Sequence, residues 1–340
     1  MIQFGYCVPI FAMPGPRLFR TPNYAQLEPV RSMALARRAD ALGYHSLWVA
    51  DHLMLGRDDA ILEGWTTLAA LAGATQRARL GMIHQAHYFR HPALAAKMIA
   101  TLDQISGGRF IFFADPAYGR AEHRAYGLPY PDDAEERIAA TAEGVELALA
   151  LWQSDEPVSF DGHFYRTEDA ACHPRPLQQP HPPVWFGEAH PHTLANCARL
   201  GQGWNSVPVG YDALKERLAA LASACQAAGR NIDEIERTLE IQILVVNEQA
   251  ELRTALQGMA DLDPSQPIQE ELRAFLSGES DDLPSAIKST WLIGTADEVS
   301  TQIERYVDLG ISHFLLWFVD APSPGGLELF AESVMPRFAR

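Results

Sequence analysis

Short apolar runs recur along this sequence and alternate with longer amphipathic segments. This alternation predicts parallel β-strands that are joined by helical crossovers. The run Phe-Ile-Phe-Phe-Ala at 110–114 contains no polar residue, which is typical of a strand that is covered on both faces. We expect eight strands, over residues 4–10, 46–50, 80–84, 109–114, 184–187, 204–207, 241–246 and 314–319.

Two architectures bury such strands: a closed barrel with an outer layer of helices, and an open sheet with helices on both faces. A β/α barrel takes about 250 residues or more as one domain. The chain has 340 residues, so we expect a single (βα)8 TIM-barrel domain over 1–340 that also carries insertions. The open, doubly wound sheet is the structural alternative.

Two stretches do not fit a simple strand and helix repeat: 116–182 after the fourth strand and 250–290 after the seventh. In the first we expect a helix over 134–152 and a hairpin near 158–165. The second contains Pro264, Pro267, Gly278 and Pro284 together with several acidic residues, which predicts an irregular excursion. Insertions of this length in a barrel often act as lids.

Two helix starts can be read directly from the sequence. Pro92 suits the first turn of a helix, where its missing N–H costs nothing. Thr295 and Glu298 stand three residues apart before an apolar repeat, which predicts a capping box.

The net charge of −16 argues against nucleic acids and anionic membranes as partners, because binding them requires clustered Lys and Arg. The N-terminal ten residues do not look like a signal peptide, and no apolar stretch approaches the ~20 residues of a membrane span. We therefore expect a cytoplasmic protein.

In a barrel, the active site lies where the strands end and the helices begin. Six histidines fall in or beside those segments: His52, His84, His87, His91, His190 and His192. A histidine there can transfer a proton near neutral pH, and Asp51 or Glu122 could orient it. For His91 a helix cap is the preferred interpretation, whereas for His84 a structural and a functional role are both open.

The segment 187–193 runs from a strand into a helix whose first turn offers free backbone amides, so a phosphate could bind there. Thr193 could add a hydroxyl and His192 a ring N–H, although a plain helix cap would look similar. No Walker loop or Rossmann glycine pattern is present in the sequence. A metal-dependent hydrolase is a competing hypothesis, suggested by His190 and His192 together with Asp51 and His52. The preferred expectation is that the protein has no metal site.

Several segments taken together resemble the luciferase-like family of flavin-dependent monooxygenases and its deazaflavin-using relatives. The segments are 39–52, 65–74, 90–110, 122–127, 182–187, 198–205 and 294–317. Each motif is weak, but their order and spacing are specific and extend nearly from end to end.

The resemblance implies an enzyme that uses reduced FMN and O₂ to oxidise a small organic substrate, with a separate reductase supplying the FMN. A deazaflavin-dependent oxidoreductase that transfers hydride is the alternative, and a non-catalytic flavin-binding protein is a weaker one. Family members often form dimers, so a homodimer is expected.

The resemblance also implies roles for particular residues. His52 and Glu122 are expected to be catalytic, with Asp51 orienting His52 or capping a helix. The residues expected to bind the cofactor are Asp51, Gln85, Ala114, Asp115, Gly187, Glu188, Ala189, His192 and Thr193. The sequence departs from the family at residues 113–116, where a glycine-rich strand end is common. Side chains there would crowd or re-aim the cofactor ring, or Asp115 would become a new polar contact.

Overall fold

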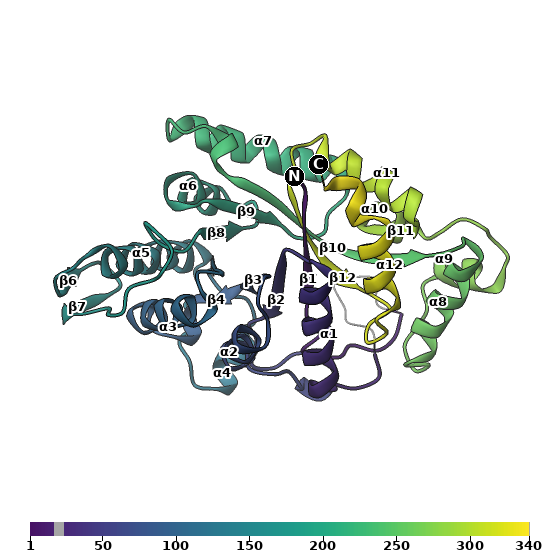
Figure 1. Cartoon of the computed structure of the whole chain (residues 1–340), viewed down its shortest axis with the longest axis horizontal. Helices are drawn as coiled ribbons and strands as arrows, with labels where there is room; N and C mark the ends of the chain where they lie inside the picture. The colour runs from purple at the N-terminus through teal and green to yellow at the C-terminus, as the bar shows by residue number, and fades with distance from the viewer. Residues whose placement is uncertain (17–23, 340) are drawn as a thin grey trace.

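The structure, a computed structural model, describes residues 1–16 and 24–339. Eight parallel strands close into a barrel in the order β1, β2, β3, β5, β8, β9, β10, β12 and back to β1 (Figure 1). The predicted barrel is therefore confirmed, and the open sheet is not. The barrel strands are β1 (Gln3–Cys7), β2 (Ser46–Ala50), β3 (Arg79–Ile83), β5 (Phe110–Asp115), β8 (Val184–Gly187), β9 (Gly203–Ser206), β10 (Glu236–Val246) and β12 (His313–Phe318).

Helices cover the outside of the barrel, as buried parallel strands require. They are α1 (Pro29–Leu42), α2 (Gly64–Ala74), α3 (Pro92–Ser106), α4 (Arg120–Ala125), α5 (Ala134–Gln153), α6 (Pro191–Leu200), α7 (Tyr211–Ala227), α8 (Ala250–Asp261), α9 (Glu270–Ser277), α10 (Ser285–Thr290), α11 (Ala296–Val307) and α12 (Gly325–Ser333). Short 3₁₀ turns lie at Arg57–Asp59, His87–Phe89, Ile232–Glu234 and Met335–Phe338.

Both predicted helix starts are confirmed. Pro92 begins α3, and the ring of His91 accepts a hydrogen bond from the N–H of Ala93 at 3.2 Å, so His91 caps this helix. At α11, Thr295 and Glu298 form the reciprocal capping box. These local signals were readable because a cap involves residues only two or three positions apart.

Large aromatic side chains fill the lower part of the barrel lumen. The rings of Trp48 and Trp185 lie 5.0 Å apart and both are fully buried. Each ring is accommodated by a glycine on the strand next to its own. A Cβ on Gly81 would lie 2.2 Å from the Trp48 ring, and a Cβ on Gly203 would lie 2.3 Å from the Trp185 ring. The lumen is a packed core at this level, so ligands can reach only the upper end, by which we mean the end of the barrel at the carboxyl ends of the strands.

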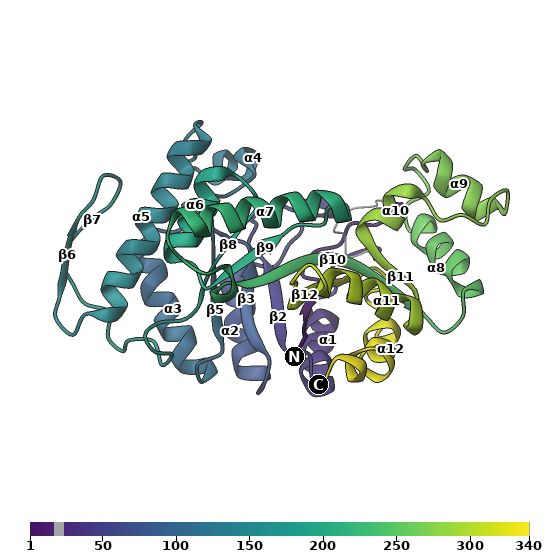
Figure 2. The same ribbon diagram turned by 90° about the horizontal axis from the view of Figure 1, so that it is seen from above.

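The first insertion has the predicted parts. Helix α5 packs against α3, and the antiparallel hairpin of β6 (Val158–Asp161) and β7 (Arg166–Ala170) follows it. Two further residues form the short strand β4 (Gln85–Ala86), which pairs with the end of β5. Figures 1 and 2 both place the hairpin at one end of the molecule and helices α8 and α9 at the opposite end.

The second insertion is ordered, so the prediction of an irregular excursion is wrong. Helices α8, α9 and α10 and the strand β11 (Trp291–Thr295) enclose a separate small core that includes Leu256, Phe275 and Ile287. The prolines that suggested irregularity lie in the turns between short amphipathic helices. Strand β11 pairs with the upper half of β10, which continues beyond its pairing with β9.

Candidate active site

His52 and Glu122 lie together at the upper end of the barrel. His52 follows β2, and its Nδ1 lies 2.9 Å from Oε1 of Glu122, which is carried by α4. Glu122 is buried, whereas the side chain of His52 is 30% exposed. Oε2 of Glu122 accepts the backbone N–H groups of Leu53 at 2.8 Å and Met54 at 3.3 Å. The helix therefore fixes both the imidazole and the loop that carries it.

The contacts of Glu122 favour its ionised form. Burial raises the pKa of Glu122, but the hydrogen bond and charge of His52 and the amides of Leu53 and Met54 together lower it below its ordinary value. A carboxylate can only accept hydrogen bonds, so Nδ1 of His52 carries the proton in this pair. In the neutral imidazole the other ring nitrogen, Nε2, is then the one that can accept a proton.

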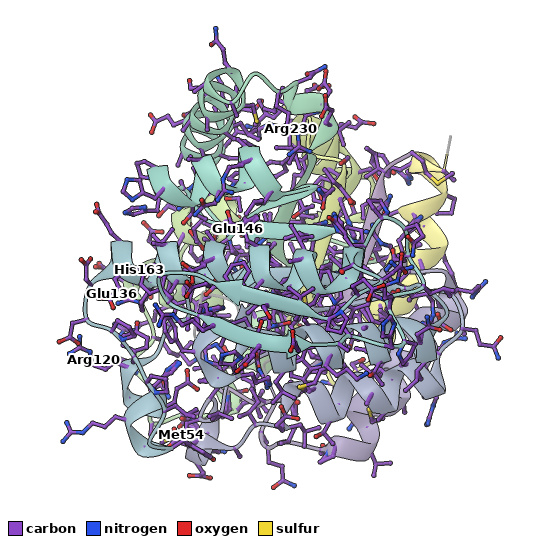
Figure 3. All side chains as sticks on the ribbon, turned by 90° about the vertical axis from the view of Figure 1, so that its left-hand side faces the viewer. Met54, Arg120, Glu136, Glu146, His163 and Arg230 are labelled. Carbon is purple, nitrogen blue, oxygen red and sulfur yellow. The ribbon has the colours of Figure 1, made fainter. Side chains whose placement is uncertain are left out.

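Gly119 allows the pair to form. This residue precedes α4 with φ +88°, a conformation that residues with a side chain rarely adopt. A Cβ at this position would lie 2.3 Å from Oε1 of Glu122. The glycine is thus needed for both the turn and the approach of the carboxylate. Figure 3 shows Met54 and Arg120, from the two segments that Glu122 joins, on the same edge of the molecule.

Asp51 does not orient His52 and does not cap a helix, so that prediction is wrong. Its carboxylate is buried and binds Arg90 through two hydrogen bonds of 2.8 and 3.1 Å. It also accepts the N–H of Ala86 at 2.9 Å. Arg90 reaches Glu63 as well, at 2.8 Å. The sequence placed the carboxylate next to His52 in the chain, but side chains of consecutive residues point apart at a strand end.

A second polar cluster, which we call the lumen cluster, consists of His84, Asp115 and Glu240. Nδ1 of His84 lies 3.4 Å from Oδ2 of Asp115, and Nε2 lies 3.8 Å from Oε2 of Glu240. Strands β3 and β10 stand on opposite sides of the barrel, so the contact between His84 and Glu240 crosses the lumen. Trp317 donates its Nε1–H to Oε1 of Glu240 at 2.6 Å.

Asp115 stands between the two groups of polar residues. Burial raises the pKa of Asp115, the charges of His84 and His52 oppose that rise, and the charge of Glu188 adds to it. Charges that act on one carboxyl must lie near it, so the strand ends that carry His52, Asp115 and Glu188 converge as the barrel requires. The departure from the family at Asp115 therefore puts a carboxyl in the lumen.

Glu240 and Gln242 were not predicted from the sequence, although a signal for them exists. Along β10 the polar residues Thr238, Glu240 and Gln242 alternate with apolar ones. A strand that is buried on both faces is expected to be apolar throughout, so polar residues at a period of two indicate a polar lumen face. The prediction began this strand at residue 241 and so missed the alternation.

The segment 187–193 is arranged differently from a simple phosphate loop. Glu188 has φ +69°, its carbonyl accepts Trp204 Nε1–H at 2.8 Å, and its carboxylate contacts Arg217 at 3.2 Å. The ring of His190 caps α6 by accepting the N–H of His192 at 3.3 Å. Thr193 is buried, Ala189 is partly buried and His192 is exposed. Part of the helix start is thus already capped.

Three other residues that were predicted to bind the cofactor lie at or beside the ends of β5 and β8: Gln85, Ala114 and Gly187. Gln85 pairs with Ala114 in the short β4–β5 ladder, and both are buried. Gln85 lines a small cavity with Phe112 and residues of α3 and α5, outside the lumen. Gly187 ends β8, where a Cβ would lie 2.9 Å from the ring of Phe113. Gly187 is therefore required for packing against β5.

Within the residues that the structure describes, no three His, Cys, Asp or Glu side chains are placed to hold a metal ion. The competing metal-dependent hydrolase receives no support from that part of the chain. No helix among the same residues is long and apolar enough to cross a membrane.

Comparison with known proteins identifies the family. The family model described as luciferase-like monooxygenase matches residues 4–313, which is nearly the whole chain. The chain belongs to this family. It is a luciferase-like flavin-dependent oxidoreductase, as the resemblance implied.

Relatives in sequence carry a more specific description. An F420-dependent glucose-6-phosphate dehydrogenase from Amycolatopsis mediterranei is 28% identical over 324 residues, which cover 92% of this chain and 95% of the relative. An F420-dependent hydroxymycolic acid dehydrogenase from Mycobacterium tuberculosis is 27% identical over 326 residues. The aligned residues cover 92% of this chain and 86% of that relative. These luciferase-like relatives use a deazaflavin.

Solved structures of the family superpose along the full chain. A monooxygenase from Streptomyces bottropensis has a TM-score of 0.77 at 26% identity, and 99% of this chain and 100% of that chain are covered. An F420-dependent secondary alcohol dehydrogenase has the same TM-score at 24% identity, with 100% and 99% covered. The latter likeness shows the fold alone.

Proposed function

We propose that this protein is a deazaflavin-dependent oxidoreductase that transfers a hydride between F420 and a small hydroxy or carbonyl compound. The observation that carries the proposal is the pair of His52 and Glu122, in which Nδ1 is held by the carboxylate and Nε2 is left as the proton acceptor of a partly exposed side chain. The sequence relatives that align over nine tenths of the chain are named as F420-dependent dehydrogenases, which supports the same reaction class.

The residues at the upper end of the lumen fit such a cofactor. Oδ2 of Asp115 is buried and faces Nδ1 of His84 at 3.4 Å, but it makes no hydrogen bond within the described residues. The pyrimidine edge of a flavin or deazaflavin carries N–H donors and carbonyl acceptors, so a buried carboxyl oxygen suits it. Asp115 and the segment that ends at Thr193 would hold the group. When bound, a deazaflavin supplies a two-electron acceptor or donor of hydride.

The protein residues supply the proton chemistry of that reaction. In the oxidation of an alcohol, a bound deazaflavin would take the hydride of the C–H bond with both electrons, which leaves the hydroxyl proton for the protein to remove. The O–H bond breaks as well, and Nε2 of His52 takes that proton while the C=O bond forms. Glu122 stabilises the resulting imidazolium, because its carboxylate already accepts Nδ1–H at 2.9 Å. In the reverse direction, the same imidazolium returns the proton to the carbonyl oxygen.

An FMN-dependent monooxygenase is the second candidate function. The family model and the 26% identical monooxygenase support it. The sequence relatives favour the deazaflavin. The FMN-dependent monooxygenase, which was the main expectation from the sequence, is therefore less well supported than the deazaflavin-dependent oxidoreductase. In the monooxygenase, O₂ would be consumed and a separate reductase would be needed.

One experiment distinguishes these candidates. The purified protein is titrated without oxygen, in parallel, with oxidised F420 and with FMN, and the fluorescence of each cofactor is followed. We expect F420 to bind more tightly, and the absorbance of oxidised F420 to fall when secondary alcohols are added. Preferential binding of FMN, together with O₂ consumption by the reduced FMN complex, would overturn the proposal.

A further inference from the structure

The lumen cluster is an unusual feature for a site that would receive an anionic substrate. Asp115 and Glu240 approach His84 from two sides at 3.4 and 3.8 Å. One imidazole thus stands between two carboxyls, and it can carry at most one positive charge. The cluster as a whole is neutral or negative at any pH at which a carboxyl is ionised.

Gln242 shows that this part of the lumen is built to receive a polar group. The residue is fully buried, and neither its Oε1 nor its Nε2 has a hydrogen-bond partner within the described residues. Gln242 follows Glu240 by two positions on β10, so both side chains point to the lumen face, with Gln242 closer to the carboxyl end of the strand. A buried carboxamide without partners is costly unless a ligand supplies a donor and an acceptor.

Two arginines near these strand ends, Arg90 and Arg217, are already paired within the part of the chain that the structure describes. Arg90 binds both Asp51 and Glu63. Arg217 binds Glu188 at 3.2 Å. Both of these guanidinium groups therefore serve carboxylates of the protein. Neither is available to neutralise a phosphate that enters the lumen.

We propose that the substrate of this site is an uncharged hydroxy or carbonyl compound, and that Asp115 and Glu240 select against phosphorylated substrates. This inference rests on the proposed hydride transfer at His52. A neutral hydroxyl or carbonyl group can pair with the carboxamide of Gln242, whereas a phosphate dianion would meet two carboxyls and a cluster without net positive charge, in a lumen with low dielectric constant. The substrate class thus differs from that of the glucose-6-phosphate dehydrogenases among the relatives.

The test uses the full chain loaded with F420 and two matched pairs of substrates. The pairs are glucose and glucose 6-phosphate, and glycerol and glycerol 3-phosphate, with 2-propanol as a small neutral alcohol. We expect every measurable turnover to come from neutral compounds, with kcat/KM at least about 100-fold above that of any phosphorylated partner. Efficient reduction of F420 by glucose 6-phosphate would overturn the inference and leave the proposed function intact.

A binding measurement tests whether the site excludes phosphate even if none of these alcohols reacts. Thermal unfolding of the F420-loaded protein is followed with increasing inorganic phosphate and, for comparison, with chloride at equal ionic strength. We expect no stabilisation specific to phosphate. A rise in Tm with phosphate that saturates would contradict the inference, because it would reveal an anion site beside the bound cofactor. Failure of F420 itself to bind would instead refute the proposed function.

Variants of the lumen cluster provide the control for charge. In Asp115→Asn with Glu240→Gln, two carboxyls become amides of nearly the same size. We expect the discrimination against phosphate to fall by about tenfold or more. Glu136→Gln removes one charge from an exposed site on α5 and is expected to leave the discrimination unchanged. Equal discrimination in the double variant and the native protein would overturn the role of the two carboxyls.

Discussion

Nδ1 of His52 and Oε1 of Glu122 lie 2.9 Å apart although 70 residues separate them in the chain. The contact joins the end of β2 to a helix in the first insertion after β5. It fixes the tautomer of the imidazole and leaves Nε2 as the proton acceptor. The proposed function and most of the predictions below depend on this relationship.

Replacing Glu122 with Gln should lower kcat without abolishing the fold. The single amide oxygen can still accept from Nδ1, but the amide NH2 cannot accept the N–H groups of Leu53 and Met54, and the group no longer carries the charge that stabilises the imidazolium. We expect kcat to fall by roughly 100-fold, within the range of general acid–base catalysis, while KM changes little. Glu136→Gln, at an exposed position on α5, is the control, and Figure 3 shows Glu136 on the same side of the molecule as Arg120. An unchanged kcat in Glu122→Gln would show that the pair has no part in the reaction.

Gly119→Ala should disturb the same pair from the side of the backbone. The new Cβ must adopt φ +88° and must also displace Oε1 of Glu122 from 2.3 Å. Gly127→Ala is the matched control, because Gly127 has φ +66° but open space around a Cβ. Both variants should lose about 1 kcal/mol of unfolding free energy from the backbone conformation. Only Gly119→Ala should also lose activity, and equal activity in the two variants would count against the contact.

Arg90→Ala should destabilise the fold strongly. It would leave the carboxylate of Asp51, whose side chain is 1% exposed, buried without its two charged hydrogen bonds. Breaking a buried pair in this way costs about 3–5 kcal/mol. Arg120→Ala removes an exposed pair with Asp132 and should cost less than about 1 kcal/mol. Urea unfolding measures both, and similar losses for the two variants would contradict the structural role of Arg90.

Asp320 should make stability depend on pH. Burial raises the pKa of Asp320 to about 6, against the opposing hydrogen bond from the N–H of Gly326. A carboxyl with a raised pKa in the folded state favours folding at low pH. That advantage is lost as the pH rises from the unfolded pKa of about 3.9 through the folded value. Asp320→Asn should therefore match the native protein near pH 3.5 and become relatively more stable by pH 7. A constant difference in unfolding free energy across that range would refute this assignment.

The barrel itself could be predicted because its signal is repeated. Eight short apolar runs that alternate with amphipathic segments, and caps such as that of Thr295 and Glu298, depend on neighbours in the sequence. The same reasoning failed for the second insertion. Its helices are short, and their apolar faces, with Leu256 and Phe275, are recognisable only when they meet one another in a separate core.

The site was predicted in part for a similar reason. His52 and Glu122 were identified through the family resemblance, and the structure brings them together. The partner of Asp51, Arg90, could not be predicted, because the pairing depends on how two loops fold over each other. The contact of His84 with Glu240 crosses the barrel and required the closed order of the strands.

The rate of hydride transfer in His52→Asn tests the central claim most directly. The native protein and the variant are loaded with F420 without oxygen and mixed with an excess of 2-propanol or another alcohol found to react. The fall in absorbance of oxidised F420 is followed, with the exposed His163→Asn as control. We predict that His52→Asn binds F420 as tightly as the native protein but transfers hydride about 100-fold to 10,000-fold more slowly. An unchanged rate in His52→Asn would contradict the assignment of His52 as the proton acceptor.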